Sequence, residues 1–312
     1  MEISKKEVEI ICVGFINIED IEYPGVETQL GVLGGAALYS ACAANIWQSK
    51  VMLVSAIGRN FPKKIKDILT SKNLEFKFIE HNNIDTMSGI TRYYSDGSRE
   101  YQMFTPLEDR ITLTPRVIEF EERLHLNQNN FSVHLSTFPP VFQIEWAKFF
   151  RSKGASLISF DTDVSFIWNN RSQIEELLSL TDICFMNLDE ASAFITDTDV
   201  VSEIAKKISA YGCSLIVIKK GEEGAYIFDK NNQKYVAVQA FSTDVVDVTG
   251  AGDSFAGTFL SIVSGGGSLE LAAKLAAATA SSCVEEYGAL HLLEKTKKQI
   301  IDKFLINGDF EQ

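Results

Sequence analysis

Short apolar runs alternate with segments of helical spacing along most of this 312-residue chain, and this alternation limits its fold more than any other feature. The runs VEIICVGFI, VMLVSAIG, NFSVHLS, ASLISFD, DICFMN and SLIVIKKG each predict a short buried strand. Stretches such as FPKKIKDILTSK, VFQIEWAKFFRSKG and SEIAKKISAYG predict helices between them. Repeated strand–helix units build a mostly parallel sheet covered by helices on both faces, so we expect an α/β fold.

One stretch interrupts this alternation. TMSGITRYYSDGSREYQMFTP, residues 86–106, is rich in aromatic side chains and contains Asp96-Gly97, a strong hairpin signal. The polar segment 17–31, with its turn signal Pro24-Gly25, is expected to pair with this hairpin in a small separate sheet. We therefore expect a single large α/β domain over residues 1–312, with a small sheet built from insertions at about 16–33 and 86–110.

The net charge of −13 bears on what the chain can bind. A strongly acidic protein has no electrostatic reason to seek nucleic acid or anionic lipid, so a bound phosphate must be held locally. No stretch approaches the ~20 apolar residues that a membrane span needs, and MEISKKEVEI carries no cleavage signal. The five cysteines are not spaced as a metal or redox pair and are expected to be buried thiols. A cytoplasmic protein is expected.

The segment DVVDVTGAGDSFAGTFL, residues 244–260, carries the strongest chemical signal. A β-prone run leads into Thr249-Gly250-Ala251-Gly252, and a helix is expected to start at about Asp253. Glycines in a tight turn let successive N–H groups converge, and the helix N-terminus adds its positive dipole end, which predicts an anion hole for a phosphoryl group. Asp253 is either a helix N-cap or a base that accepts the proton of an attacking hydroxyl.

DVTGAGDSFAG closely resembles the second signature of the ribokinase-like, or phosphofructokinase-B, family of carbohydrate and nucleoside kinases, Asp-Thr-Thr-Gly-Ala-Gly-Asp-x-Phe. Only Val248 departs from it, and the order of elements resembles the family over nearly the whole chain. The resemblance implies a ribokinase-like three-layer αβα fold whose small sheet acts as a lid. It also implies ATP and Mg²⁺ as cofactors, with K⁺ as a further candidate. The expected catalytic residues are Asp253, Gly250, Ala251 and Gly252.

The same resemblance implies a nucleotide side of the site. Asn187-Leu188-Asp189-Glu190 is similar to the family's Asn-x-x-Glu motif, in which Glu190 organises Mg²⁺ through water and Asn187 lies near the phosphates. The alternative is a helix cap with an acidic first turn. IKKGEEGAY, residues 218–226, resembles the nucleotide loop, although its glycine spacing also marks hairpin turns. The expected nucleotide ligands are Asn187, Lys219 (or Lys220), Gly221, Gly224, Thr249 and Ala277, with Glu190 and Asn187 at the metal.

On the acceptor side, GGAALYSA resembles the family's first glycine pair, but Tyr39 stands where the family usually has Asn. An acidic residue after the first strand usually holds the sugar, and Asp20 is ranked slightly ahead of Glu19. The expected acceptor ligands are Asn17, Glu19, Asp20, Gly34, Gly35, Tyr39 and Arg110. The alternatives are close helix packing for the glycines, a solvated lid turn for residues 17–20 and a surface arginine for Arg110. Residues 161–168 depart from the family's Asp-x-Asn-x-Arg pattern because Asp163 replaces the Asn, which indicates divergent specificity.

We therefore expect in-line transfer of the γ-phosphoryl group of ATP to a hydroxyl of a sugar or sugar-like molecule. A nucleoside kinase, or a non-catalytic metabolite or ATP sensor on a kinase fold, is the alternative. A dinucleotide-dependent oxidoreductase needs G-x-G-x-x-G after the first strand, where this chain offers only Gly14. The aromatic lid residues are expected to stack on a nucleobase, to form the lid core or to contact a second subunit in a homodimer; they are Tyr93, Tyr94, Tyr101 and Phe104.

Overall fold

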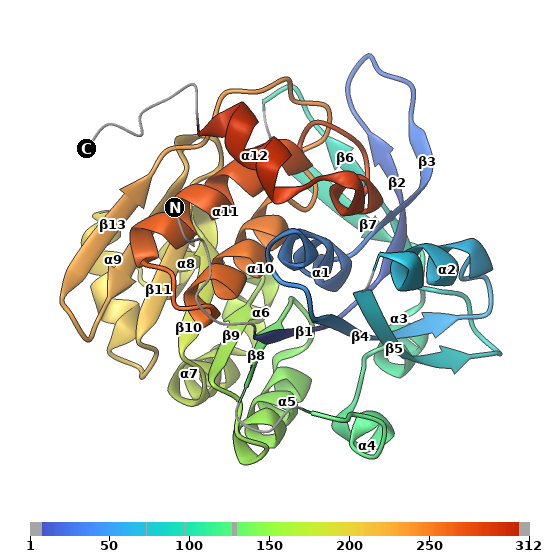
Figure 1. Ribbon diagram of the computed structural model, residues 1–312, viewed down its shortest axis with the longest axis horizontal. Helices are drawn as coiled ribbons and strands as arrows, with labels where there is room; N and C mark the ends of the chain where they lie inside the picture. Colours follow the sequence, from blue (N-terminus) through green and yellow to red (C-terminus); the bar gives the residue numbers. More distant parts are fainter. Residues whose placement is uncertain (1–7, 73, 97, 127–129, 306–312) are drawn as a thin grey trace.

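The computed structural model describes residues 8–72, 74–96, 98–126 and 130–305, and they form one large sheet with helices around it (Figure 1). The strand order is β13-β12-β11-β10-β9-β8-β1-β4-β5. Strands β5 to β11 of this order are parallel to their neighbours, and β12 and β13 continue the sheet antiparallel. The strands are β1 (Glu9–Val13), β4 (Val51–Gly58), β5 (Leu74–His81), β8 (Phe131–Leu135), β9 (Leu157–Asp161), β10 (Ile183–Asn187), β11 (Leu215–Lys219), β12 (Ala225–Asp229) and β13 (Lys234–Val238). The expected mostly parallel sheet is confirmed.

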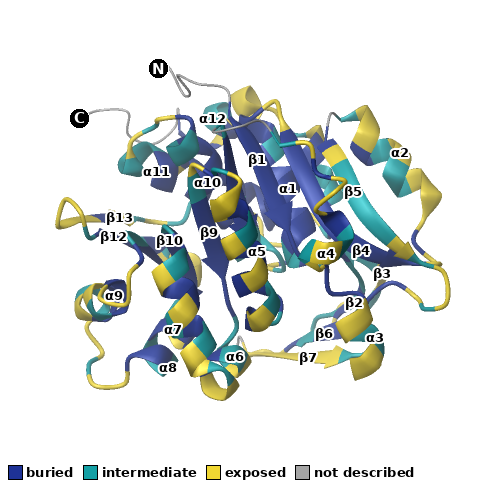
Figure 2. Ribbon diagram, turned by 90° about the horizontal axis from the view of Figure 1, so that it is seen from below, coloured by how far each residue is buried: buried dark blue, intermediate teal, exposed yellow. Residues whose placement is uncertain are grey.

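Helices cover both faces of this sheet because successive side chains of each strand enter different cores. In β1, Ile10 and Cys12 join the core on one face, and Ile11 and Val13 join the core on the other. The central strands β1 and β9 are buried (Figure 2). The first core contains α1 (Ala36–Trp47), α10 (Ala251–Ser264) and α11 (Leu269–Cys283), and the second contains α5 (Pro140–Ser152), α7 (Arg171–Leu180), α8 (Leu188–Phe194) and α9 (Val201–Ser209).

The carboxyl ends of the parallel strands meet at one edge of the large sheet. From β1 the chain adds β4 and β5 on one side and then β8 to β11 on the other, so its direction of growth reverses next to β1. Ligands of open α/β sheets bind outside the carboxyl ends of the strands at such a reversal. Strands β9, β10 and β11 end at Asp161, Asn187 and Lys219, which places three polar side chains on this edge.

A second, small sheet has the order β3-β2-β6-β7 and is separate from the large one (Figure 1). Its strands are β2 (Asn17–Glu22), β3 (Gln29–Gly34), β6 (Ser88–Tyr93) and β7 (Arg99–Met103). Two antiparallel hairpins, β2–β3 and β6–β7, are joined by parallel pairing of β2 with β6. The expected separate sheet is confirmed, and segment 17–31 is more regular than its polar composition indicates. Of the expected Asp96-Gly97 turn, Gly97 lies outside the described residues.

The remaining elements are α2 (Lys63–Ser71), α3 (Leu107–Thr112), α4 (Val117–Phe120), α6 (Val164–Asn169), α12 (Lys297–Phe304) and the 3₁₀ turns η1 (Gly221–Glu223) and η2 (Leu290–Glu294). Within the described residues, no helix combines the length and the apolar character that crossing a membrane requires. All five cysteines are buried and free, as the sequence predicts.

Candidate active site

Helix α10 begins at a glycine with a left-handed backbone. Gly250 is the N-cap, with φ 79° and ψ 0°, a conformation that glycine adopts without strain. A Cβ at this position would also lie 2.3 Å from the ring of Tyr39, so no larger residue fits. The helix starts at Ala251, two residues before the expected start, and Asp253 is its third residue. The alternative reading of Asp253 as the N-cap is therefore wrong.

The Asp253 carboxylate is left without a partner side chain. Among the described residues, none donates a side-chain hydrogen bond to it, and the Ser40 hydroxyl bonds to the backbone carbonyl of Asp253 instead, at 3.1 Å. Burial, followed by the charge of Asp161, raises the pKa of Asp253 to about 6, and this value includes the opposing effect of Lys219 and Arg99. An unpaired carboxylate whose pKa lies near neutral suits a general base.

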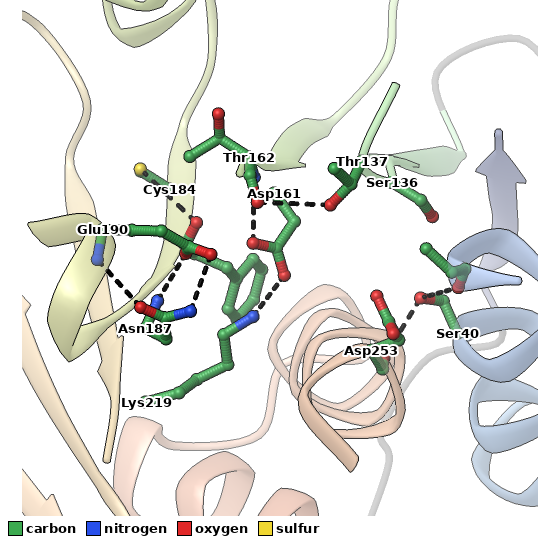
Figure 3. A network of polar contacts seen from close by, with 12 residues as sticks. Ser40, Ser136, Thr137, Asp161, Thr162, Cys184, Asn187, Glu190, Lys219 and Asp253 are labelled. Carbon is green, nitrogen blue, oxygen red and sulfur yellow. Dashed lines mark hydrogen bonds and ion pairs between the residues drawn. The ribbon is translucent and has the colours of Figure 1, made fainter. Parts of the chain in front are cut away.

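Lys219 lies at the centre of a charged cluster on the strand ends (Figure 3). Its Nζ forms an ion pair with Asp161, and their side chains are 15% and 3% exposed. Burial alone would lower the pKa of Lys219, but the carboxylates of Asp161, Glu190 and Asp253 raise it, so the lysine stays charged. A Cβ on Gly252 would lie 3.2 Å from Nζ, which places the cation directly beside the first turn of α10.

The sequence predicts that either Lys219 or Lys220 supplies a cation to the nucleotide phosphates. The structure places these two lysines differently. Lys220 turns to Glu223 with an Nζ–Oε2 distance of 2.5 Å. Lys219 therefore faces Asp253 and Lys220 does not.

Asn187 and Glu190 form a reciprocal capping box at the start of α8. The Glu190 carboxylate accepts hydrogen bonds from the backbone N–H and from Nδ2 of Asn187, both at 2.7 Å. Asn187 Oδ1 accepts the Glu190 N–H at 2.8 Å. Burial, followed by the charge of Asp161, raises the pKa of Glu190 to about 8. The structural alternative for this motif is thus present, and the surroundings of Glu190 disfavour its charged form, which a bound cation would stabilise.

Three expected nucleotide ligands have structural roles in this conformation. Gly224 has φ 91°, and a Cβ there would lie 1.9 Å from the Val238 carbonyl, so strand packing already requires this glycine. Ala277 is 4% exposed within the core, which leaves little surface for an adenine contact. The Thr249 hydroxyl is engaged by Asp247 at 2.7 Å and by Tyr93 at 2.8 Å. Only Gly221, with no atom within 4 Å of an added Cβ, borders open space.

Glu19, not Asp20, faces the catalytic side of the small sheet. Glu19 is 6% exposed, and Asn17 Nδ2 donates to its Oε1 at 2.7 Å. Burial raises the pKa of Glu19, and so do the charges of Asp247 and Asp253, which places this carboxylate near α10. The Asp20 carboxylate instead accepts the Gly31 N–H at 2.9 Å. The geometry thus reverses the order in which the sequence ranks these two residues.

The glycine pair and Tyr39 form the floor of the site. A Cβ on Gly35 would lie 2.6 Å from the Phe15 carbonyl, and one on Gly34 would lie 3.1 Å from the Tyr39 ring, so close packing requires both glycines. Tyr39 is 1% exposed, and its hydroxyl has no partner among the described residues. Its ring packs against Gly250, so in this conformation it has a packing role, and its contact with the acceptor stays a prediction. Arg110 is half-buried, and its Nε also has no partner among these residues.

Sequence reasoning missed two charged residues of this region. Asp161 is the last residue of the buried run ASLISFD, just as Asn187 and Lys219 are the last residues of β10 and β11. A polar residue at the end of an apolar run could therefore have identified Asp161 as a site residue. Arg99 lies in an exposed lid strand, and nothing in its sequence neighbourhood marks it. Its charge nevertheless lowers the pKa values of Asp253 and Glu19.

An unpaired carboxylate at a helix N-terminus, next to a buried lysine, the strand-end residue Asp161 and Glu190 in the first turn of α8, fits the class of phosphotransferases. The chain matches the pfkB family of carbohydrate kinases over residues 10–296 and belongs to that family. It is 27% identical over 286 residues to a cytidine kinase of Thermococcus kodakarensis, a match that covers 90% of this chain and 98% of that enzyme. A 2-dehydro-3-deoxygluconokinase of Dickeya dadantii is 29% identical over 150 residues, 46% of this chain and 48% of that one.

The fold agrees with this assignment. The crystal structure of Methanocaldococcus jannaschii nucleoside kinase superposes with a TM-score of 0.73 at 23% identity, covering 96% of this chain and 98% of that chain. The ribokinase-like three-layer fold is thereby confirmed. The chain is an ATP-dependent kinase, with Mg²⁺ as the metal of its family, that phosphorylates a hydroxyl group of a sugar or nucleoside. The family agrees with the expected kinase and, as the sequence indicates, not with a dinucleotide-dependent oxidoreductase.

Proposed function

We propose that the chain phosphorylates the primary hydroxyl of a nucleoside, with Asp253 as the general base. The acceptor oxygen attacks the γ-phosphorus of ATP in line, the bond from that phosphorus to the β–γ bridging oxygen breaks, and ADP leaves with the electron pair. The hydroxyl proton passes to the Asp253 carboxylate and then to solvent. The observation that carries this proposal is the Asp253 carboxylate in the first turn of α10, with a pKa of about 6 and no partner side chain among the described residues.

Backbone N–H groups at the start of α10 stabilise the charge of the transferring group in this proposal. The N–H of Ala251 bonds weakly to the Val248 carbonyl, at 3.4 Å. The N–H groups of Gly250 and Gly252 have no such bond within the described residues and remain available. The cradle therefore relies mainly on the two glycines, with Lys219 as its cation.

The choice of a nucleoside as acceptor rests on relatives and on the small sheet. The cytidine kinase matches this chain along nearly its full length, whereas the gluconate-type sugar kinase matches less than half of it. Glu19 and Asn17 offer oxygens to sugar hydroxyls. Tyr101 is 43% exposed, and its hydroxyl lies 3.4 Å from Asn17 Nδ2, which puts an aromatic ring beside these groups where a base can stack.

Glu190 and Asn187 would hold Mg²⁺, mainly through bound water. No group of three or more acidic, histidine or cysteine side chains in the described residues could bind a metal. This fits Mg²⁺, which uses one or two carboxylates together with substrate phosphates. Burial and the charge of Asp161 raise the pKa of Glu190 by disfavouring its charged form, and a bound cation would stabilise that form. When bound, Mg²⁺ neutralises phosphate charge.

The proposal extends to K⁺ at the buried residue Asp247. This aspartate is 0% exposed, and its Oδ1 accepts hydrogen bonds from the Tyr23 hydroxyl at 3.0 Å and from Thr249. Its Oδ2 is buried and has no hydrogen-bond partner among the described residues. An orphaned carboxylate oxygen in such a position suits a monovalent cation.

We further propose that the chain works as one α/β domain whose small sheet closes over the acceptor as a lid and excludes water, a competing nucleophile. The cytoplasm is the proposed compartment, because ATP is available there and the five free thiols fit a reducing environment. Recovery of the native chain from a membrane or secreted fraction would contradict this location.

A panel of acceptors tests the proposed reaction. ADP release is measured with cytidine, uridine, adenosine, guanosine, ribose, fructose and 2-dehydro-3-deoxygluconate, with K⁺ or with tetramethylammonium as the monovalent cation. We expect kcat/KM for at least one nucleoside to exceed that for every free sugar by about 10²-fold or more, because the base adds stacking and hydrogen bonds. We expect K⁺ to raise the rate. A free sugar as best acceptor would overturn the nucleoside assignment, and equal rates in both salts would overturn the K⁺ site.

We propose a homodimer formed through the lid edge. Strand β3 is an edge of the small sheet, and Leu30 on this strand is 75% exposed. Leu30→Asp should convert the dimer into a monomer in size-exclusion chromatography with light scattering. Ile118→Asp is the matched control, because Ile118 is 81% exposed on α4, which packs against α5. A monomeric mass for the unmodified chain would refute this assembly.

A further inference from the structure

Arg99 is a lid residue whose guanidinium reaches toward the catalytic centre. It is the first residue of β7 and lies directly opposite Tyr93 in the register of β6 and β7. Its charge lowers the pKa of Tyr93 and acts on three carboxylates from separate elements, those of Glu19, Asp253 and Glu190. The guanidinium therefore lies among the groups that surround the expected path of the phosphoryl group.

Tyr93 fixes this part of the lid to the loop before α10. The Tyr93 hydroxyl lies 2.8 Å from the Thr249 hydroxyl, and Thr249 immediately precedes the N-cap Gly250. The Tyr93 ring stacks on Tyr23 with centroids 4.4 Å apart and an interplanar angle of 6°. Tyr23 in turn accepts the Val248 N–H at 3.0 Å. Two stacked lid tyrosines thus hold the Tyr93–Arg99 pair against the loop that opens the anion cradle.

The guanidinium of Arg99 is also free to bind an anion. It forms no ion pair with any carboxylate of the described residues, although acidic groups surround it. Arg92, in the neighbouring strand of the same lid, is in contrast neutralised by Glu22 at 3.2 Å and bonded to Gln102 at 2.9 Å. Arg99 is exposed and carries no carboxylate partner within the part of the chain that the structure describes, so its N–H donors can bind an anion, and arginine stabilises phosphoryl oxygens through such donors.

We propose that Arg99 is a catalytic residue that binds an equatorial oxygen of the transferring phosphoryl group when the lid is closed, with Tyr93 as its positioning residue. The inference rests on the proposed kinase site and adds a cation that the lid supplies. Lys219 approaches the transferring group from the large sheet, and Arg99 approaches from the small one. Phosphoryl transfer to the acceptor is thereby linked to closure of the lid. Arg99, the second cation, is in place only when Tyr93 of the lid is docked on Thr249.

Arg99→Ala tests this role, with Arg92→Ala as the matched lid control. We expect Arg99→Ala to lower kcat by about 10²-fold or more, with both KM values changed by less than about threefold, whereas Arg92→Ala keeps near-normal kcat. Millimolar guanidinium chloride should restore part of the Arg99→Ala rate, and Arg99→Lys should retain an intermediate rate because it keeps the charge without the planar fork. The acid limb of the pH–rate profile should move to higher pH in Arg99→Ala, because Arg99 lowers the pKa of Asp253.

A binding measurement separates this inference from the proposed reaction. ADP with aluminium fluoride mimics the transferring group, and calorimetry should show its affinity weakened about tenfold or more in Arg99→Ala, with ADP alone unchanged. Equal weakening for ADP alone, or a raised acceptor KM at normal kcat, would overturn the assignment. If Asp253→Asn abolishes turnover while Arg99→Ala does not change it, the catalytic role of Arg99 is refuted and the proposed kinase reaction stands. Absence of turnover with every acceptor would count against the proposed function, and the fluoride complex would still decide the role of Arg99.

Discussion

Replacing Asp253 by Asn should lower kcat by about 10²-fold or more while leaving ATP binding nearly unchanged. The amide keeps the shape of the carboxylate and removes its basicity, so the acceptor hydroxyl loses the group that takes its proton. The α10 start and its glycine cap do not depend on this side chain, because Gly250 is the N-cap. Steady-state kinetics with the best acceptor, and calorimetry with ATP, measure the two quantities.

The pH dependence of the wild-type rate belongs to the same prediction. The base is active only when it is ionised, so kcat/KM should fall as the pH drops through about 6, the raised pKa of Asp253. Asp253→Asn should lose this limb. A profile without an acid limb near this pH, or near-normal turnover of the variant, would contradict the assignment of Asp253 as the base.

The folded state should be more stable in Asp253→Asn, which controls for misfolding. Because the folded carboxylate has a higher pKa than the unfolded one, stability falls as the pH rises from about 4 to about 6, and the penalty is complete above that range. Its upper limit is about 3 kcal/mol. Urea denaturation at pH 8 should therefore show a higher free energy of unfolding in the variant than in the wild type, whereas at pH 4 the two should nearly agree.

Lys219→Met is expected to have the second largest effect, and it should reduce both stability and activity. Removing one partner of a buried ion pair leaves the Asp161 charge uncompensated, at a cost of about 3–5 kcal/mol. The loss of the cation beside Gly252 should also lower kcat/KM for ATP by about 10²-fold. Denaturant unfolding and ATP-dependent kinetics measure the two effects.

The neighbouring lysine provides the control. Lys220→Met removes an ion pair whose Glu223 partner is 67% exposed, so we expect a change in unfolding free energy of about 0.5 kcal/mol or less and normal kinetics. The double variant Lys219→Met/Asp161→Asn should regain stability but not activity, because the buried charge is gone and the phosphate cation remains absent. Recovery of activity in the double variant would show that Lys219 acts only on the fold.

The sequence predicts well those parts of the site whose position depends on neighbouring residues in the chain, such as the glycine turn before α10 and the strand ends. Gly250 and Asp253 sit in one motif, whose residue types predict a glycine turn followed by a helix. Asn187 and Lys219 end apolar runs, and parallel strands bring such ends to one edge of a sheet. The two-residue error in the start of α10 arose because the left-handed Gly250, and not the first acidic residue, serves as the cap.

Contacts that depend on register or on the docking of the lid could not be predicted. The side of the sheet that Glu19 and Asp20 face depends on strand pairing, and the pairing of β2 with β3 shifts register between Glu19 and Ile21. An irregularity of this kind moves side chains to the opposite face without a sequence signal. The position of Arg99 near the site could not be predicted for a related reason. Only the pairing of β6 with β7 places Arg99 opposite Tyr93.

The two sheets divide the work between them. The groups proposed to handle phosphate from the large sheet, Asp253 and Lys219, belong to α10 and β11. The groups proposed to meet the acceptor, Glu19 and Tyr101, stand on β2 and β7, and β7 also carries Arg99. A change of substrate range therefore calls for changes in two short hairpins, within which Tyr93 and Arg99 have to be kept for the proposed transfer chemistry. Grafting those hairpins from a relative with another acceptor, with Tyr93 and Arg99 retained, would give a new specificity with the same transfer chemistry.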